Sequence, residues 1–341
     1  MKDETLADAG VAQAKRMRWD GRARPHYEVW YTTASHLTTG AGFWIRYAIL
    51  SPSRGVPRVQ VWFTSFVPDL AESNVAAAQE YSIEHFSGET AEPWGLRIGP
   101  SLLEQGRMTG MLDAAGTPVT WDLVYQPVTD ALDLLPKPFY RTRWVSTKVT
   151  VPHPFLMIGG KIQIGGRTFI LNGDPAQQGH VWGSRHAAEW IWFHCSAFVD
   201  DLGESVPGYV TGVTAQPRVA GFVLPPVSFG HVVWKDAHGA LRPATPWQSR
   251  RDDRWIWSGR LGDDDVTATV TFPWSAMVLA RYEDPSGGEV FCHHTERGDC
   301  TLQLRVPRQP PRIFRAASSA HLEIGSRKAD PRAPRRVMLQ R

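Results

Sequence analysis

Short runs of aromatic and β-branched residues recur along this chain, and turns rich in Gly, Pro and Ser separate them. The first three runs cover residues 26–33, 42–51 and 58–67. Side chains of this kind favour strands, and the intervening residues are those that favour turns. Strands that recur about every 8–12 residues, with almost no helical pattern, predict an all-β chain built as antiparallel barrels or sandwiches.

The same alternation of strand-forming runs and turn residues continues to the end of the chain. The 15 Trp, 30 Gly and 26 Pro of the sequence favour short strands over long helices. The segment 161–171 predicts a hairpin with a Gly165-Gly166 turn, residues 68–80 predict one helix, and residues 127–143 are Pro-rich and irregular. Further strands are predicted at residues 81–86, 94–99, 106–113, 118–126, 144–151, 189–198, 208–214, 218–224, 229–235, 254–259, 265–272, 276–283, 289–295, 300–305 and 320–326.

Bulk composition excludes several classes of protein. The 341 residues fit two ordinary domains or one large β domain, and a net charge of +3 gives no case for a nucleic-acid partner. Three cysteines argue against a disulfide framework and for a reducing, cytoplasmic location, with a Cys292–Cys300 bridge left open. We expect neither a signal peptide nor a membrane span. The basic residues 327–341 predict a solvated tail that can be attracted to an anionic membrane surface.

The segment 173–198 concentrates three Trp, three His, an Arg and a Glu. As a strand, its second half places Trp190, Trp192 and His194 on one face, together with Ser196 and Phe198. Glu189, Ile191, Phe193, Cys195 and Ala197 fall on the other face. Each residue taken alone fits a core strand with partnered polar groups, whereas the segment as a whole indicates a binding site.

The first two strands also carry ionisable groups on alternating positions. Glu28 and Trp30 share one face of the first strand, and Trp44 and Arg46 share one face of the second. If the strands are neighbours, Glu28 and Arg46 can form an interior ion pair. The alternative is a functional role, because burial and nearby partners shift the pKa of a carboxyl group as a general acid requires.

A third polar cluster lies at residues 292–296, where alternation places His294 and Glu296 on one face and His293 on the other. With His180, His186 and His194 available, a metal site is conceivable, but no compact ligand spacing supports one. P-loop, dinucleotide-binding and nucleophile-elbow motifs are absent. The remaining pattern is a cofactor-free, aromatic-lined cavity for an apolar ligand.

Residues 145–198 resemble the superfamily of tocopherol cyclase and hydroxyneurosporene synthase, a carotenoid hydratase. A Gly-rich hairpin precedes Trp182-Gly183, a Trp-x-Trp strand follows at 190–192, and Glu28, Trp30 and Tyr31 match the family's first strand. This resemblance implies two lipocalin-like β domains around a cavity for an isoprenoid or polyketide-like molecule. Known relatives cyclise, hydrate or close rings without cofactors, and some have no known activity.

Departures from the family pattern change which groups in such a pocket can donate or accept a proton. His194 stands where the family has Gln, His180 replaces an acidic or Lys position, and residues 185–189 lack the usual Pro. These changes put tocopherol cyclisation itself in doubt. The domains that we predict are an arm at 1–24, a first β domain at 25–178, a second at 179–326 and the tail at 327–341.

Three functions remain open from the sequence. The first is a cofactor-independent cyclase, hydratase or isomerase with Glu28 or His194 as acid, and His180 and Glu189 next. The second is a lipocalin-like carrier of a hydrophobic small molecule, and the third is a metal-assisted hydrolase. In the first two, ligand contacts are expected from Trp30, Trp44, Arg46, Trp182, Arg185, Trp190 and Trp192.

Overall fold

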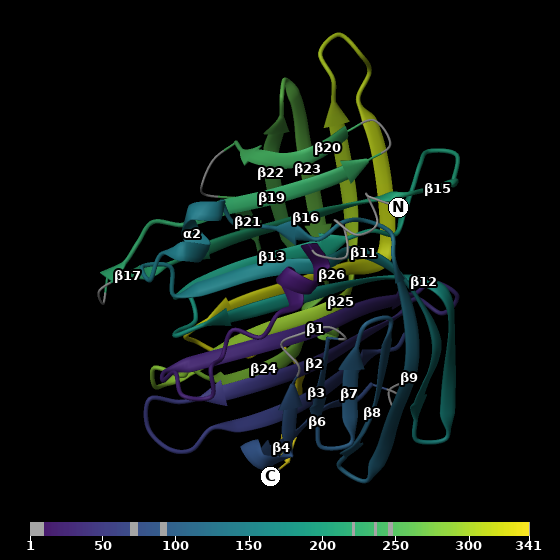
Figure 1. Cartoon of the computed structure of the whole chain (residues 1–341). Helices are drawn as coiled ribbons and strands as arrows, with labels where there is room; N and C mark the ends of the chain where they lie inside the picture. The colour runs from purple at the N-terminus through teal and green to yellow at the C-terminus, as the bar shows by residue number, and fades with distance from the viewer. Residues whose placement is uncertain are drawn as a thin grey trace.

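The computed structural model describes residues 10–68, 74–88, 94–219, 222–234, 237–244 and 248–340. Nearly all regular structure in these ranges is β, which confirms the predicted class (Figure 1). The exceptions are one helical turn at residues 10–15, the short helix α2 (Lys137–Arg141) and the 3-10 turns η2 (Ile83–His85) and η3 (Trp274–Ala276). No helix among the described residues is long and apolar enough to cross a membrane.

The first sheet is open and mixed. All of its neighbouring strands are antiparallel except β28 and β4, which are parallel. Its spatial order is β28 (Met338–Gln340), β4 (Ala76–Ser82), β3 (Arg58–Phe66), β2 (Ala41–Ser51), β1 (His26–His36), β12 (Arg167–Gly183), β11 (Thr147–Ile164), β9 (Thr117–Pro127), β8 (Arg107–Ala114), β7 (Ser101–Glu104), β6 (Gly95–Ile98) and β5 (Phe86–Gly88), with β10 (Leu132–Asp133) beside β11.

The second half of the chain closes into an eight-stranded barrel, because β25 pairs with β26 as well as with β23. Closure removes the free edges that an open sheet presents. The barrel order is β26 (Arg312–Ser326), β13 (Glu189–Cys195), β16 (Gly208–Gln216), β19 (Val227–Trp234), β20 (Ala237–Pro243), β22 (Arg254–Leu261), β23 (Asp264–Thr271) and β25 (Glu289–Arg305).

Five short strands and one two-stranded hairpin flank the barrel. Of these, β27 runs parallel to β24, and β17 and β18 form a separate two-stranded hairpin. The five single strands are β14 (Phe198–Val199), β15 (Ser205–Val206), β21 (Ser249–Arg251), β24 (Val278–Glu283) and β27 (Arg335–Arg336). The hairpin consists of β17 (Arg218–Val219) and β18 (Phe222–Val223). In Figure 1 the purple and blue strands of the first sheet lie below the green strands of the barrel.

Strands β1 and β2 are buried along their whole length because each of their faces packs on a different layer. Trp30 and Phe43 face the core of the first sheet. Tyr31 and Trp44 face the barrel and form an interdomain core with Trp192 and with strands β24 and β25. This burial on both faces explains why aromatic residues occupy odd and even positions of these strands.

The helix predicted at residues 68–80 is wrong for residues 76–80, which belong to β4, while residues 69–73 lie outside the described residues. Pairing with β3 overrides the helix propensity of the Ala-rich run. The small, buried Ala78 lies opposite Trp62 and leaves room for that large ring.

Two further expectations are corrected at strand ends. Strand β13 ends at Cys195, so Phe198 belongs to the barrel core and not to the face of Trp192. The segment 327–341, expected as a solvated tail, contributes strands β27 and β28. Cys195, Cys292 and Cys300 are buried free thiols, so the Cys292–Cys300 bridge is not formed.

Candidate functional site

Glu28 lies on the inner face of β1 and is 0% exposed. Its Oε1 accepts hydrogen bonds from the Arg18 backbone N–H (2.7 Å) and from His180 Nε2 (2.8 Å). Its Oε2 accepts from the Trp19 backbone N–H (2.8 Å) and lies 3.1 Å from His26 Nε2. Burial alone raises the pKa of Glu28, but the hydrogen bonds from His180 and His26 outweigh it and hold the pKa at about 2. The carboxylate form is therefore favoured, and it lacks the proton that a general acid donates.

His180 is fixed between two indole rings. Its ring lies 4.8 Å from both the Trp30 and the Trp182 rings and is stacked on each. Its Nδ1 lies 2.7 Å from the Ala14 carbonyl oxygen, and because a carbonyl only accepts, Nδ1 carries a proton. Trp30 Nε1 donates to the Lys15 carbonyl oxygen (2.9 Å). Trp30 and Trp182, predicted as ligand contacts, thus contact the protein's own imidazole.

The N-terminal arm fills the inside of the first sheet. Lys15 is 2% exposed, its Nζ donates to the Tyr125 hydroxyl (3.0 Å), and it lies over the Trp94 ring. Thr150 Oγ1 donates to the Ala14 carbonyl oxygen (2.8 Å). The described part of the predicted arm is therefore ordered against the core, and the Glu28 network helps to hold it there.

A second acid–imidazole cluster lies between the first sheet and the barrel. Glu296 on β25 contacts His294 Nε2 through Oε1 and His321 Nδ1 through Oε2. The Ser35 hydroxyl of β1 lies 3.4 Å from His321 Nε2. All four residues are buried. The order hydroxyl, imidazole, carboxylate is the one in which a carboxylate orients an imidazole that accepts a proton.

His194 lies beside this cluster. Its ring stacks on that of His321 at 6.0 Å, and neither of its nitrogens has a hydrogen-bond partner within the described residues. Burial lowers the pKa of His194 and of His294 well below the usual value and lowers that of His321 to about 3. These imidazoles are therefore neutral at neutral pH and present lone pairs inside the protein.

Several other buried polar atoms near this layer have no partner among the residues described. They are the hydroxyl oxygens of Thr33, Thr64 and Ser319 and the indole nitrogen of Trp44. Buried polar groups in folded proteins nearly always form hydrogen bonds. A ligand that carries hydroxyl or carbonyl groups would form hydrogen bonds with these four side chains.

Aromatic rings form the rest of this layer. Trp44 lies 4.7 Å from the His294 ring and 6.3 Å from the Trp62 ring, and Tyr31 meets Trp192 edge-on at 5.7 Å. The prediction that Trp190, Trp192 and His194 share a face of β13 agrees with this arrangement, because Phe193 and Cys195 lie in the barrel core.

The predicted Glu28–Arg46 ion pair is wrong, although β1 and β2 are neighbours. Glu28 points into the first sheet, whereas the Arg46 guanidinium points towards the barrel and lies over the rings of Trp62 (4.9 Å) and Tyr282 (4.5 Å). The register explains the difference, since Arg46 pairs with Tyr31, an odd position of β1.

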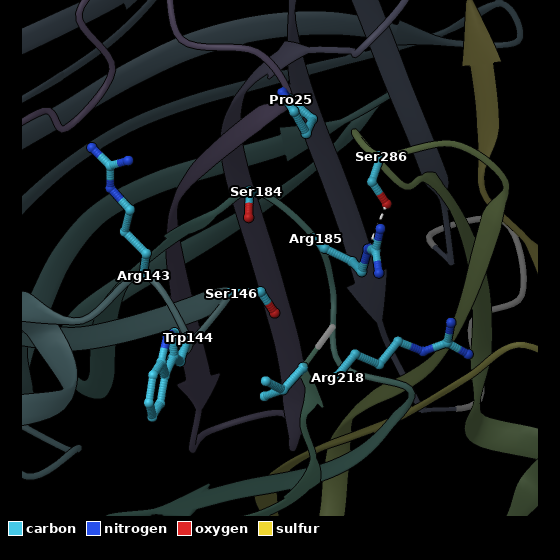
Figure 2. Close-up of a pocket in the computed structure, with 9 residues that line it drawn as sticks. Pro25, Arg143, Trp144, Ser146, Ser184, Arg185, Arg218 and Ser286 are labelled. Atoms are coloured by element: carbon cyan, nitrogen blue, oxygen red, sulfur yellow. Dashed lines mark hydrogen bonds between the residues drawn. The ribbon is translucent and has the colours of Figure 1, made fainter. Parts of the chain in front are cut away.

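The remaining predicted residues lie elsewhere. Glu189 is exposed at the start of β13, and Arg185 lines a surface hollow (Figure 2). Trp190 is partly buried, with its Nε1 3.4 Å from Glu323. His293 is on the opposite face from His294 and accepts from the Asp330 backbone N–H (2.8 Å). Within the described ranges, no group of three or more His, Cys, Asp or Glu side chains has metal-binding geometry.

His321 and Ser35 were not predicted as site residues. A pattern in the sequence indicates the cluster, because two of the three His-x-Glu runs, at 26–28 and 294–296 but not at 321–323, bring the histidine and the carboxylate into contact. In each case a neighbouring strand supplies a further histidine to the carboxylate, His180 from β12 and His321 from β26. The two halves of the molecule thus carry similar polar clusters in different surroundings.

Comparisons with known proteins agree with this fold. The sequence profile of the family described as tocopherol cyclase-like matches residues 147–326, just over half of the chain. No curated protein sequence matches the chain significantly.

Two solved structures resemble the chain at low sequence identity. The AttH-like protein of Nitrosomonas europaea has a TM-score of 0.50 and 13% identity, over 91% of this chain and 97% of that one. Kievitone hydratase from Nectria haematococca has a TM-score of 0.49 and 11% identity, over 92% and 94%. At this level the likeness to the AttH-like protein concerns the fold alone.

Proposed function

The chain belongs to the tocopherol cyclase-like family, and on this premise we propose that it cyclises, hydrates or isomerises a lipophilic polyene, isoprenoid or polyketide-like molecule without a cofactor. The observation that carries the proposal is the buried cluster of Ser35, His321, Glu296 and His294, with His194 beside it. It combines proton-transfer groups with an aromatic wall, which is what such chemistry requires.

Each group in the cluster has a chemical role in this proposal. Glu296 holds two imidazoles in fixed tautomers, and His321 accepts a proton from a substrate hydroxyl or from water. An imidazole with a lowered pKa becomes a strong acid once protonated, so it returns that proton readily to an olefinic carbon. The face of Trp44 stabilises the positive charge that develops there.

The proton balance differs between the reactions. In cyclisation, a substrate hydroxyl loses a proton to an imidazole, the olefin gains one, and the oxygen closes the ring, so the product has the substrate's mass. In hydration, a water molecule supplies the oxygen and both hydrogens, so the product gains the mass of one water. The same imidazoles can serve either path.

Turnover of purified protein tests the proposal. A prenylated phenol and a linear polyene are incubated with the full chain, and products are measured by liquid chromatography and mass spectrometry. We expect His321→Gln and His194→Gln each to lower kcat by about 100-fold. His293→Gln on the opposite face of β25 is the matched control, and Glu28→Gln tests the acid that the sequence predicts. Full turnover in both the His321 and His194 variants would exclude this cluster.

The alternative is a carrier with no chemistry, and the unpartnered hydroxyls of Thr33, Thr64 and Ser319 support it because they would bind a ligand equally well. Native mass spectrometry of freshly purified protein separates the two functions. A bound lipid that stays intact on incubation indicates a carrier, whereas a ligand whose mass or retention changes indicates an enzyme. We also propose a cytoplasmic location, which the three free thiols support.

A further inference from the structure

A surface hollow of about 540 Å³ lies where the ends of β11 and β12 approach the barrel (Figure 2). Three arginines line it, each from a different part of the chain: Arg143 before β11, Arg185 after β12 and Arg218 in β17. Its volume falls within the range of about 300–1,000 Å³ that is usual for sites that bind small molecules.

The hollow is positively charged. None of its lining residues, all of which lie in the described ranges, is acidic. Arg185 Nε donates to the Ser286 hydroxyl (2.8 Å), as Figure 2 shows. The Ser286 hydroxyl in turn donates to Asp284 (2.8 Å), which does not line the hollow. Arg327 also donates to Asp284 (2.6 Å) and balances its charge. The three lining guanidinium groups therefore leave a net positive charge at the hollow.

A second observation points to an anion. The Nε of Arg218 is buried and has no hydrogen-bond partner in the part of the chain that the structure describes. A buried donor without an acceptor destabilises the folded protein. A guanidinium group matches the planar oxygens of a carboxylate or a phosphate, so a ligand with such a group would satisfy Arg218.

Apolar side chains border the arginines. Trp144 lines the hollow and is 77% exposed. Phe222 is 74% exposed on β18, which pairs with the strand that carries Arg218. Large exposed apolar residues beside a cationic hollow offer a surface on which the apolar body of a ligand can pack.

We propose that this hollow binds an anionic amphiphile. Arg185 and Arg218 hold its carboxylate or phosphate group, and its apolar body lies across Trp144. The proposal does not depend on the activity of the interdomain cluster, because it rests on charge and exposure at a separate surface.

Titration calorimetry on the full chain tests the proposal with four probes: dodecanoate and dodecyl phosphate below their micelle concentrations, inorganic phosphate, and dodecanol. We expect one site per chain for the two anionic amphiphiles and at least about tenfold weaker binding of the other two. The stronger of the two amphiphiles identifies the head group as carboxylate or phosphate.

Variants locate the site. We expect Arg185→Met and Arg218→Met each to weaken amphiphile binding by about tenfold, because each removes a charged hydrogen-bond donor. Trp144→Ala should weaken amphiphile binding and leave that of inorganic phosphate unchanged. Exposed Arg254 on β22 provides the control Arg254→Met, and melting temperatures verify folding.

Three outcomes would overturn the proposal. The first is equal binding of dodecanol and dodecanoate, which indicates an apolar contact only. The second is unchanged binding in the Arg185 and Arg218 variants. The third is binding that survives both substitutions but is lost in His194→Gln, which would place the ligand in the interdomain cluster and support the proposed function instead.

Discussion

At the scale of single residues, Glu28 should contribute stability that depends on pH. Its folded pKa of about 2 lies below the ordinary value of 4.5, so the folded state resists protonation. The contribution is present above about pH 5 and is lost as the pH falls towards 2. We expect Glu28→Gln to lower the free energy of unfolding by about 3 kcal/mol at pH 7, and by less at pH 3.5, in urea denaturation.

The matched control is the exposed Glu189 on β13. Glu189→Gln should change the free energy of unfolding by less than about 0.5 kcal/mol at either pH. Equal effects of the two substitutions would contradict the role assigned to the Glu28 hydrogen bonds.

The interdomain histidines should make the protein sensitive to mild acid. The folded pKa of His321 is about 3, below the ordinary 6.5, because the ring is buried. Below pH 6.5 the unfolded chain binds the proton and the folded chain does not, so stability falls as the pH falls. At pH 5 this difference amounts to about 2 kcal/mol.

The His321→Gln variant should therefore lose less stability than the wild type between pH 7.5 and pH 5, as measured by urea unfolding at both values. His85→Gln, at an exposed position, should follow the wild type. If the variant lost as much stability as the wild type, the His321 imidazole of the wild type would be protonated in the folded state.

The residues of the interdomain layer were partly predictable. Alternation on β13 is enough to place Trp192 and His194 on one face, because a strand admits only two faces. Alternation cannot say which layer each face meets, and for this reason Glu28 and Arg46 were wrongly paired. His321 escaped prediction because its partner Glu296 lies 25 positions earlier, and only the pairing of β25 with β26 joins them.

At the scale of elements, the C-terminal strands tie the two halves together. β28 covers the edge of β4, while β27 pairs with β24 beside the barrel. Arg335 of β27 also donates to the Ser65 carbonyl oxygen (3.0 Å) and lies over the Phe66 ring. The basic segment is therefore part of the fold, which reduces the number of cations available to a membrane surface.

Truncation before Met338 should lower the melting temperature by roughly 2–4 °C, because it exposes the edge of β4. Truncation before Arg335 should lower it further, since it also removes β27 and the Arg335 contacts. Differential scanning calorimetry measures both effects. Melting of both truncated chains at the full-length temperature would show that these strands add no stability.

The strands themselves were predicted well because each carries its own alternation and turn residues. β7, β20 and residues 312–319 of β26 were not predicted as strands. Residues 76–80 were predicted as a helix, since Ala, Gln and Glu favour a helix when taken alone. Their strand conformation depends on pairing with the preceding strand β3 and with β28, whose Met338 lies opposite Ala77. Local propensity contains no information about such partners.

At the scale of the whole molecule, the close packing of the first sheet on the barrel depends on Gly42. A Cβ added there would lie 2.4 Å from Glu296 Cβ and 2.9 Å from the Glu296 carbonyl oxygen. We expect Gly42→Ala to separate β2 from β25, to destabilise the protein by about 1–3 kcal/mol and to lower turnover. Gly166→Ala, whose added methyl meets open space in the hairpin turn, is the control in urea unfolding and in the activity assay.

The return of β28 to β4 also constrains how a ribosome makes this protein. About 250 residues separate the two strands, so at 5–20 residues per second the edge of β4 stays unpaired for roughly 13–50 s. During that interval the first half of the chain presents an unpaired edge to other nascent chains. A cell that makes this protein in quantity must therefore protect β4 until β28 leaves the ribosome.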